Sequence, residues 1–174
     1  REARRLHDET DYYLTYSGFP GYFRTDPDWL CRLLLEKETI KAENQLTLER
    51  SIEKADKVIR SLGQYVQAVR ISCDMGTQRG PWCDPSLIEE AVIPYFKEFC
   101  AYIHRNSDLM VHLHSCGGIR PLIPMLIDAG IDILNPVQIS AADMDPRELK
   151  EQFGDRITFW GGGCDTQNIL RGDS

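Results

Sequence analysis

The sequence predicts an α/β protein in which four buried strands alternate with helices. Two features lead to this prediction: short apolar runs end in polar or glycine-rich residues, and Asp-Pro pairs stand before helical stretches. The predicted strands cover residues 65–73, 110–116, 131–134 and 157–160. Such a series forms a parallel sheet with right-handed crossovers. Polar residues after every strand are typical of a (β/α)8 barrel, and a small open flavodoxin-like sheet is the alternative.

The N-terminal region is predicted to be helical. Residues 1–25 indicate a short helix followed by a loop whose aromatic side chains anchor it to the core. Asp26-Pro27 then begins a helix, because Asp accepts a cap hydrogen bond and Pro suits the first turn. A second helical stretch runs from about residue 46 to 62, and Gly63 ends it.

Three more helices are predicted between the strands. The first begins at Asp84-Pro85 and runs to near Arg105, and the second covers residues 121–129. The third begins at Asp145-Pro146 and stops near Gly154. Each therefore follows one buried strand and precedes the next, as a parallel sheet requires.

The composition argues against two classes of protein, nucleic-acid binders and membrane-spanning proteins. The 174 residues carry a net charge of −7, which argues against a nucleic-acid binder, and no apolar run approaches the roughly 18 residues of a membrane span. Six cysteines follow no framework pattern, so we expect reduced thiols in a cytoplasmic protein. We treat residues 1–174 as one domain. Because a full barrel needs about 250 residues, we expect a fragment of a longer barrel, with open sheet edges that favour self-association.

The stretch 112–118 is the candidate metal site. Side chains alternate along a strand, so His112, His114 and Cys116 share one face at the carboxyl end, where α/β folds bind ligands. Imidazole nitrogen and thiolate sulfur are ligands that zinc prefers. A zinc site needs at least one further protein ligand. The structural alternative is a buried cysteine beside hydrogen-bonded histidines.

Four motifs at successive strand ends carry a family resemblance. They are DMGTQRG at 74–80, HSCGG at 114–118, DILNPVQ at 132–138 and GGGCDTQ at 161–167. Together they resemble the uroporphyrinogen decarboxylase superfamily, over about residues 26–174. Within it the chain is similar to the cobalamin-dependent methyltransferases, which include methylcobamide:coenzyme M methyltransferases. The resemblance implies a (β/α)8 barrel, present here as about four parallel strands after N-terminal helices.

The resemblance also implies a zinc site and a reaction. Family members hold zinc through a His-x-Cys pair and a distant cysteine. His114 and Cys116 match the pair. The distant cysteine would lie beyond Ser174, and Cys164 is the candidate substitute for it. The implied enzyme moves a methyl group between a corrinoid (methylcobalamin), carried by a partner protein, and a small-molecule thiol. Asp74 and Arg79 are the candidate catalytic residues, with Arg79 holding an anionic group. The candidate substrate-binding residues are Gln78, Asn135, Gln138, Asp165 and Gln167.

Two other functions remain open from the sequence. One is decarboxylation of a porphyrinogen-like acid, in which Asp74 would stabilise a protonated pyrrole. The family's N-terminal arginine motifs are absent or unlike here, which counts against that reaction. The other is a non-catalytic barrel that binds a ligand or a corrinoid protein.

Overall fold

A five-stranded parallel sheet forms the centre of the molecule. The structure, a computed structural model, describes residues 1–169. The strands are β1 (Thr15–Pro20), β2 (Ala68–Ser72), β5 (Met110–His114), β6 (Ile133–Asn135) and β7 (Thr158–Phe159). Their order in the sheet is their order in the chain, and all neighbours are parallel. The α/β class and the four predicted strands are therefore confirmed. Over the described residues the sheet is open, with β1 and β7 at its edges.

The sequential strand order contradicts the flavodoxin-like alternative. In that fold the second strand lies outside the first, giving the order 2-1-3-4-5. Here β1, β2 and β5 are consecutive neighbours, so each crossover moves the chain one strand further in the same direction. Sheets that advance in this way keep their helices on one face.

The first strand is a correction to the sequence prediction. Residues 15–20 form β1, although the aromatic region was predicted to be a loop after the first helix. β1 pairs with β2 from Thr15↔Ala68 to Pro20↔Ser72, with a shift in register between Ser17 and Phe19. The aromatic anchors were correctly predicted in part: the rings of Phe19 and Phe99 lie 5.0 Å apart, in the core.

α2, α4 and α7 begin at the predicted Asp-Pro caps, while one predicted helix is divided and another begins early. The helices are α1 (Glu2–Glu9), α2 (Pro27–Leu35), α3 (Lys37–Leu62), α4 (Pro85–Ala91), α5 (Ile93–Asn106), η1 (Arg120–Leu122), α6 (Ile123–Asp128) and α7 (Pro146–Phe153). The single helix predicted from Asp84-Pro85 is divided at Val92. Pro94 explains the division, because its ring excludes it from a helix interior. α3 also begins earlier than predicted, directly after α2.

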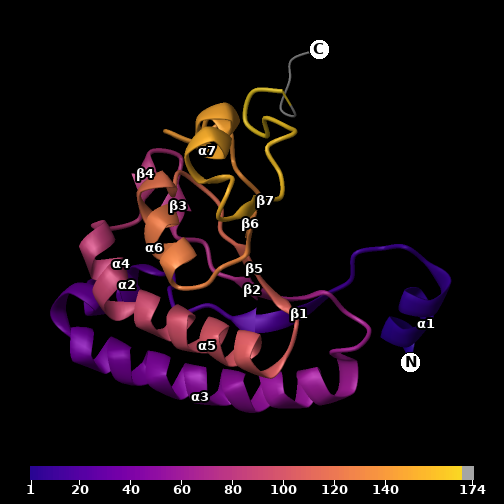
Figure 1. The fold of residues 1–174 in the computed structure, drawn as a ribbon. Helices are drawn as coiled ribbons and strands as arrows, with labels where there is room; N and C mark the ends of the chain where they lie inside the picture. The colour runs from indigo at the N-terminus through magenta and orange to yellow at the C-terminus, as the bar shows by residue number, and fades with distance from the viewer. Residues whose placement is uncertain (170–174) are drawn as a thin grey trace.

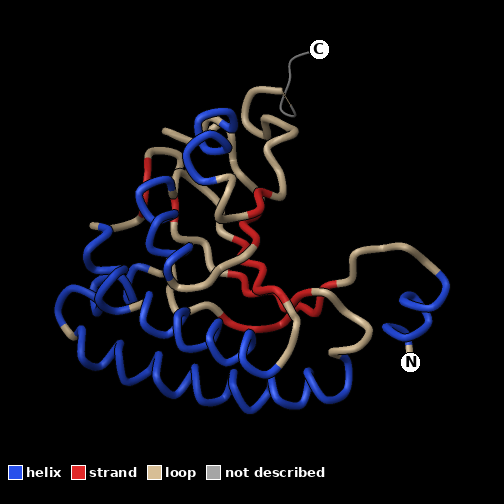
Figure 2. The backbone as a smooth tube through the Cα atoms, viewed as in Figure 1, coloured by secondary structure: helices blue, strands red, loops and turns tan. Residues whose placement is uncertain are grey.

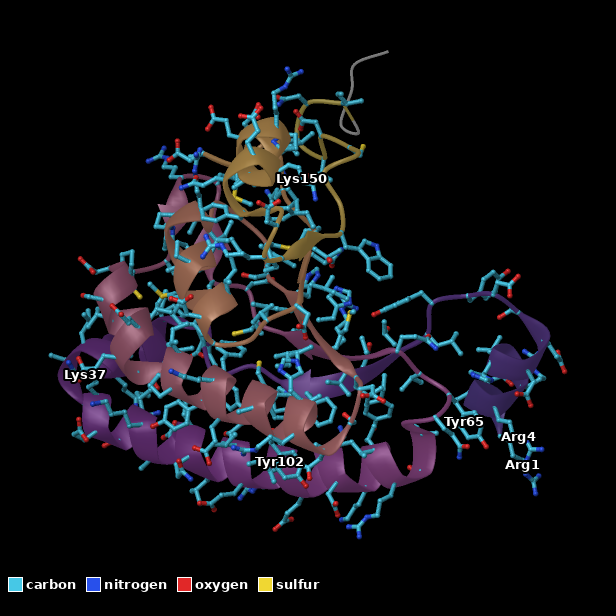
Figure 3. All side chains as sticks on the ribbon, in the orientation of Figure 1. Arg1, Arg4, Lys37, Tyr65, Tyr102 and Lys150 are labelled. Carbon is cyan, nitrogen blue, oxygen red and sulfur yellow. The ribbon has the colours of Figure 1, made fainter. Side chains whose placement is uncertain are left out.

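The helices cover one face of the sheet and leave the other face largely uncovered. In Figures 1 and 2, α3 and α5 run side by side along the sheet, with α6 and α7 beyond them, and α1 stands apart at the end of β1. Tyr65, labelled in Figure 3, lies beside α1 and packs edge-on against His7 at 5.7 Å. The covered face carries the fully buried Val69, Val111 and Leu134.

The uncovered face carries polar and exposed side chains. Arg70 and His112 pair across β2 and β5, and Ser72 pairs with His114. Met110 is 46% exposed on the same face. Among residues 1–169, no helix is both long and apolar enough to cross a bilayer.

Candidate metal centre

Asp74, His114 and Cys116 converge at the carboxyl edge of the sheet. β2 and β5 are neighbours in parallel register, so the residues that follow Ser72 meet those at the end of β5. His114 Nε2 lies 3.7 Å from Asp74 Oδ1 and 3.5 Å from Cys116 Sγ. One ligand atom from each residue lies within 4.8 Å of the other two. Ligands of a tetrahedral zinc ion are separated by roughly 3.3 to 3.8 Å, so the three side chains fit zinc with small adjustments.

Asn135 fixes the orientation of the His114 ring. Its Nδ2 donates to the carbonyl of Trp160 at 2.9 Å, so its Oδ1 faces His114 Nδ1 at 2.7 Å. An amide oxygen only accepts, so Nδ1 carries the proton and Nε2 presents its lone pair. This arrangement is the one that metal-bound histidines use, with the second ring nitrogen held by a hydrogen bond.

The surroundings of the Cys116 thiol favour its protonated form in the metal-free protein. Its partial burial raises its pKa, and the carboxylate of Asp74 raises it further, while the charge of Arg70 acts in the opposite direction. The Cys116 backbone N–H donates to Asp74 Oδ1 at 2.9 Å, so Asp74 is held against the end of β5. A bound divalent cation would supply the charge that converts this thiol into a thiolate ligand.

Two glycines allow the loops after β2 and β5 to touch. Gly117 has φ +87, and a Cβ there would lie 2.2 Å from the backbone of Gly76. Ser115 Oγ also accepts from the N–H of Met75 at 3.0 Å. Gly76–Thr77 forms β3, which pairs with β4 (Gly80–Pro81) in a short antiparallel hairpin. The close backbone contact therefore holds Asp74 and Cys116 at a fixed separation.

A pocket of about 380 Å³ lies beside Cys116. Its lining includes Pro136, Gln138, Cys164 and Thr166 together with the glycines at 161–163. Gln138 Oε1 accepts from the N–H of Gly117 at 2.9 Å, which ties the pocket wall to the metal cluster. Cys164 shares this pocket with Cys116 but is not part of the Asp74, His114 and Cys116 group. In the structure it is Asp74, and not Cys164, that lies within 4.8 Å of both His114 and Cys116 as a possible third ligand.

The remaining candidate residues lie outside the cluster. Gln78 and Arg79 are exposed at the hairpin turn between β3 and β4. Asp165 accepts from the backbone N–H groups of Gln167 and Asn168, both at 2.9 Å, so it caps a turn. The side-chain hydrogen bond that Asn168 donates to Asp165, followed by these backbone bonds, lowers the pKa of Asp165. Gln167 is exposed in the same turn. We find no side-chain hydrogen bond from Gln78 or Arg79 to the cluster residues.

Sequence reasoning missed a second group on the uncovered face. The His112 ring is buried and stacks on Trp160, with centroids 5.2 Å apart and an interplanar angle of 18°. Neither ring nitrogen of His112 has a hydrogen-bond partner, and neither does Nε of Arg70. Burial, followed by the charge of Arg70, lowers the pKa of His112 to about 4. The alternation of side chains along the strand could have indicated that His112 lies on the same face as His114. That Arg70 lies next to His112 depends on the pairing of β2 with β5, which the local sequence does not show.

The comparisons with known proteins leave the chain without an assigned family. No family model, curated protein or solved structure matches it.

Proposed function

We propose that this chain is part of a zinc-dependent methyltransferase of the uroporphyrinogen decarboxylase superfamily, on its cobalamin-dependent branch. The observation that carries the proposal is the cluster of Asp74, His114 and Cys116 at the strand ends, with His114 Nε2 facing the other two ligand atoms. The reaction would move a methyl group between a corrinoid on a partner protein and a small-molecule thiol. Three protein ligands leave one position of a tetrahedral ion for that thiol.

The architecture supports the barrel that this family would require. The five parallel strands follow one another in chain order, their helices lie on one face, and the cluster lies at their carboxyl ends. In (β/α)8 barrels the active site lies at that end, on the loops after the strands. We infer that β1, β2, β5, β6 and β7 are consecutive strands of such a barrel.

The chain's own residues have separate tasks in the proposed reaction. Zinc, when bound, would supply the positive charge that lowers the pKa of a coordinated thiol enough for it to exist as a thiolate at neutral pH. Cys116 Sγ and His114 Nε2 would hold the ion, and Asp74 would complete the set of protein ligands. Asn135 holds the proton on His114 Nδ1 and so keeps Nε2 available. The pocket bounded by Pro136 and the glycines at 161–163 offers mostly apolar walls beside the position of that thiol.

The proposal is tested by cobalt(II) substitution followed by thiol titration. Cobalt bound to Cys116 should give a thiolate-to-metal charge-transfer band, and an added thiol that enters the fourth position should increase it. Cys116→Ser should abolish the band of the thiol-free protein. Cys31→Ser is the matched control, because Cys31 is an exposed thiol on α2. Methyl transfer from methylcobalamin to the same thiol would then be measured with the zinc protein. A cobalt protein without a thiolate band would contradict the proposal.

A further inference from the structure

Two side chains with buried, unpartnered nitrogens lie on neighbouring strands below the metal cluster. Arg70 on β2 and His112 on β5 are direct partners in the parallel register, so both side chains project from the uncovered face. His112 is 4% exposed and both of its ring nitrogens lack partners. Nε of Arg70 is likewise buried without a partner. Buried polar groups are nearly always hydrogen-bonded, so two unsatisfied neighbours indicate a missing acceptor.

We propose that Arg70 and His112 form a subsite for a small-molecule carboxylate on the uncovered face of the sheet. A guanidinium presents two parallel N–H groups to the two oxygens of a carboxylate, and an adjacent imidazole adds a third donor. This subsite is independent of the metal. It gives the face a second recognition point beside the proposed thiol position.

The charges around the pair favour a single negative charge. Arg70 is the one arginine on β2 and β5, and Asp74 lies four residues further along the same strand end. A phosphate dianion would meet one cation and a nearby carboxylate, whereas a carboxylate balances Arg70 alone. Ser72, between Arg70 and Asp74, is exposed and has a short side chain.

Trp160 controls access to the subsite. Its indole stacks on the His112 ring, is itself 43% exposed, and packs edge-on against Tyr13 at 5.6 Å. A ligand that reaches His112 must displace the indole or slide beneath its edge. Bound carboxylate should therefore change the environment of Trp160 as well as that of His112.

The test is a titration of acetate followed by NMR on protein with ¹⁵N-labelled histidine rings. The four histidines would be assigned through single variants, and the metal would be stripped and the chelator removed beforehand, so that neither acetate on a metal nor a chelator carboxylate contributes. Acetate should shift the His112 nitrogens saturably, whereas acetamide, its uncharged counterpart at the same ionic strength, should not. Trp160 fluorescence should follow the same binding curve.

Variants of Arg70 separate recognition from general charge effects. Arg70→Met should weaken acetate binding by about 10- to 100-fold, the cost of losing a charge-assisted bidentate pair. Arg70→Lys, which keeps the charge but not the planar fork, should bind with intermediate affinity. Arg50→Met on the exposed side of α3 should bind as the wild type does. Circular dichroism would confirm that each variant is folded.

Three results would overturn the proposal. The first is the absence of a saturable acetate response in the folded wild-type chain. The second is an equal response in Arg70→Met and Arg50→Met. The third is that the wild type binds no acetate but self-associates, and that Arg70→Met abolishes this self-association. That result would assign Arg70 and His112 to a contact between chains. Because the metal is removed, these results are separate from the cobalt test of Cys116.

Discussion

His114 Nδ1 and Asn135 Oδ1 lie 2.7 Å apart, and this contact decides which nitrogen of the imidazole is free to bind a metal. Asn135 cannot turn its amide round, because its Nδ2 donates to the carbonyl of Trp160 at 2.9 Å. The lone pair of His114 Nε2 therefore points between Asp74 and Cys116. Three neighbouring strands, β5, β6 and β7, thus contribute to the orientation of one ligand.

Asn135→Ala should weaken metal binding while leaving all three ligands in place. The ring of His114 would lose the group that fixes its tautomer and its rotation. Loss of such an outer partner typically costs about 10- to 100-fold in metal affinity. Competition with a chromophoric chelator would measure the change. Asn106→Ala, at the exposed end of α5, is the matched control and should bind zinc as the wild type does. Equal affinities for the two variants would disprove the orienting role.

The rate of thiol alkylation should differ among the cysteines according to their burial and their contact with a bound metal. Burial raises the pKa of Cys73 to about 12 and raises that of Cys100 further, so both should remain unmodified until the chain unfolds. The exposed Cys31 and Cys164 should react first, since their thiols are open to solvent. Metal-free Cys116 should react more slowly than they do, because its raised pKa leaves less thiolate.

Zinc should protect Cys116 and no other described cysteine. Mass spectrometry of peptides after timed alkylation, with and without zinc, would give the rate at each position. In Asp74→Ala the protection should be reduced, since one ligand is lost. Zinc protection of Cys164 in the wild type would instead identify Cys164 as a ligand, and Asp74 would lose that role.

Gly117→Ala should destabilise the fold and separate the loops that carry the cluster. The new Cβ would meet the backbone of Gly76 at 2.2 Å, and the residue would have to adopt φ +87. A conformation of that kind costs of order 1–3 kcal/mol before the clash is added. Denaturant unfolding should show a loss of at least about 2 kcal/mol. Gly163→Ala, where a Cβ would meet nothing within 4 Å, should lie close to wild type, and a similar loss in both would refute the explanation.

The strands that the sequence predicted are those that carry several apolar residues close together. β5 and β6 hold Val111, Leu113, Ile133 and Leu134, all buried, so the pattern itself indicates a strand covered by helices. β1 was not predicted, because Gly18 and Pro20 interrupt it and because Phe19 is its one buried residue. Its strand conformation comes from pairing with β2, which is a tertiary contact. Local sequence does not encode that kind of pairing.

The sequence allowed prediction of those parts of the site that lie on a single strand. Alternation along residues 110–116 placed His114 and Cys116 on one face, and the structure brings them within 3.5 Å. That Asp74 joins them depends on the register Ser72↔His114 between β2 and β5. Asn135 was predicted to bind substrate, which stays a prediction; its hydrogen bond with His114 was not predicted. Arg79 was predicted to bind an anion, whereas Arg70 is the arginine on the sheet face.

Metal content is the measurement that tests the central claim most directly. The chain, purified with zinc and freed of loosely bound ions, would be analysed by mass spectrometry for zinc per polypeptide, as wild type and as three single variants. We expect one zinc in the wild type and in Cys164→Ser, and a loss of bound zinc in Cys116→Ser and in Asp74→Ala. A wild-type chain that is folded but retains no zinc, or a Cys116→Ser variant that retains it fully, would contradict the assignment of this cluster as the metal centre.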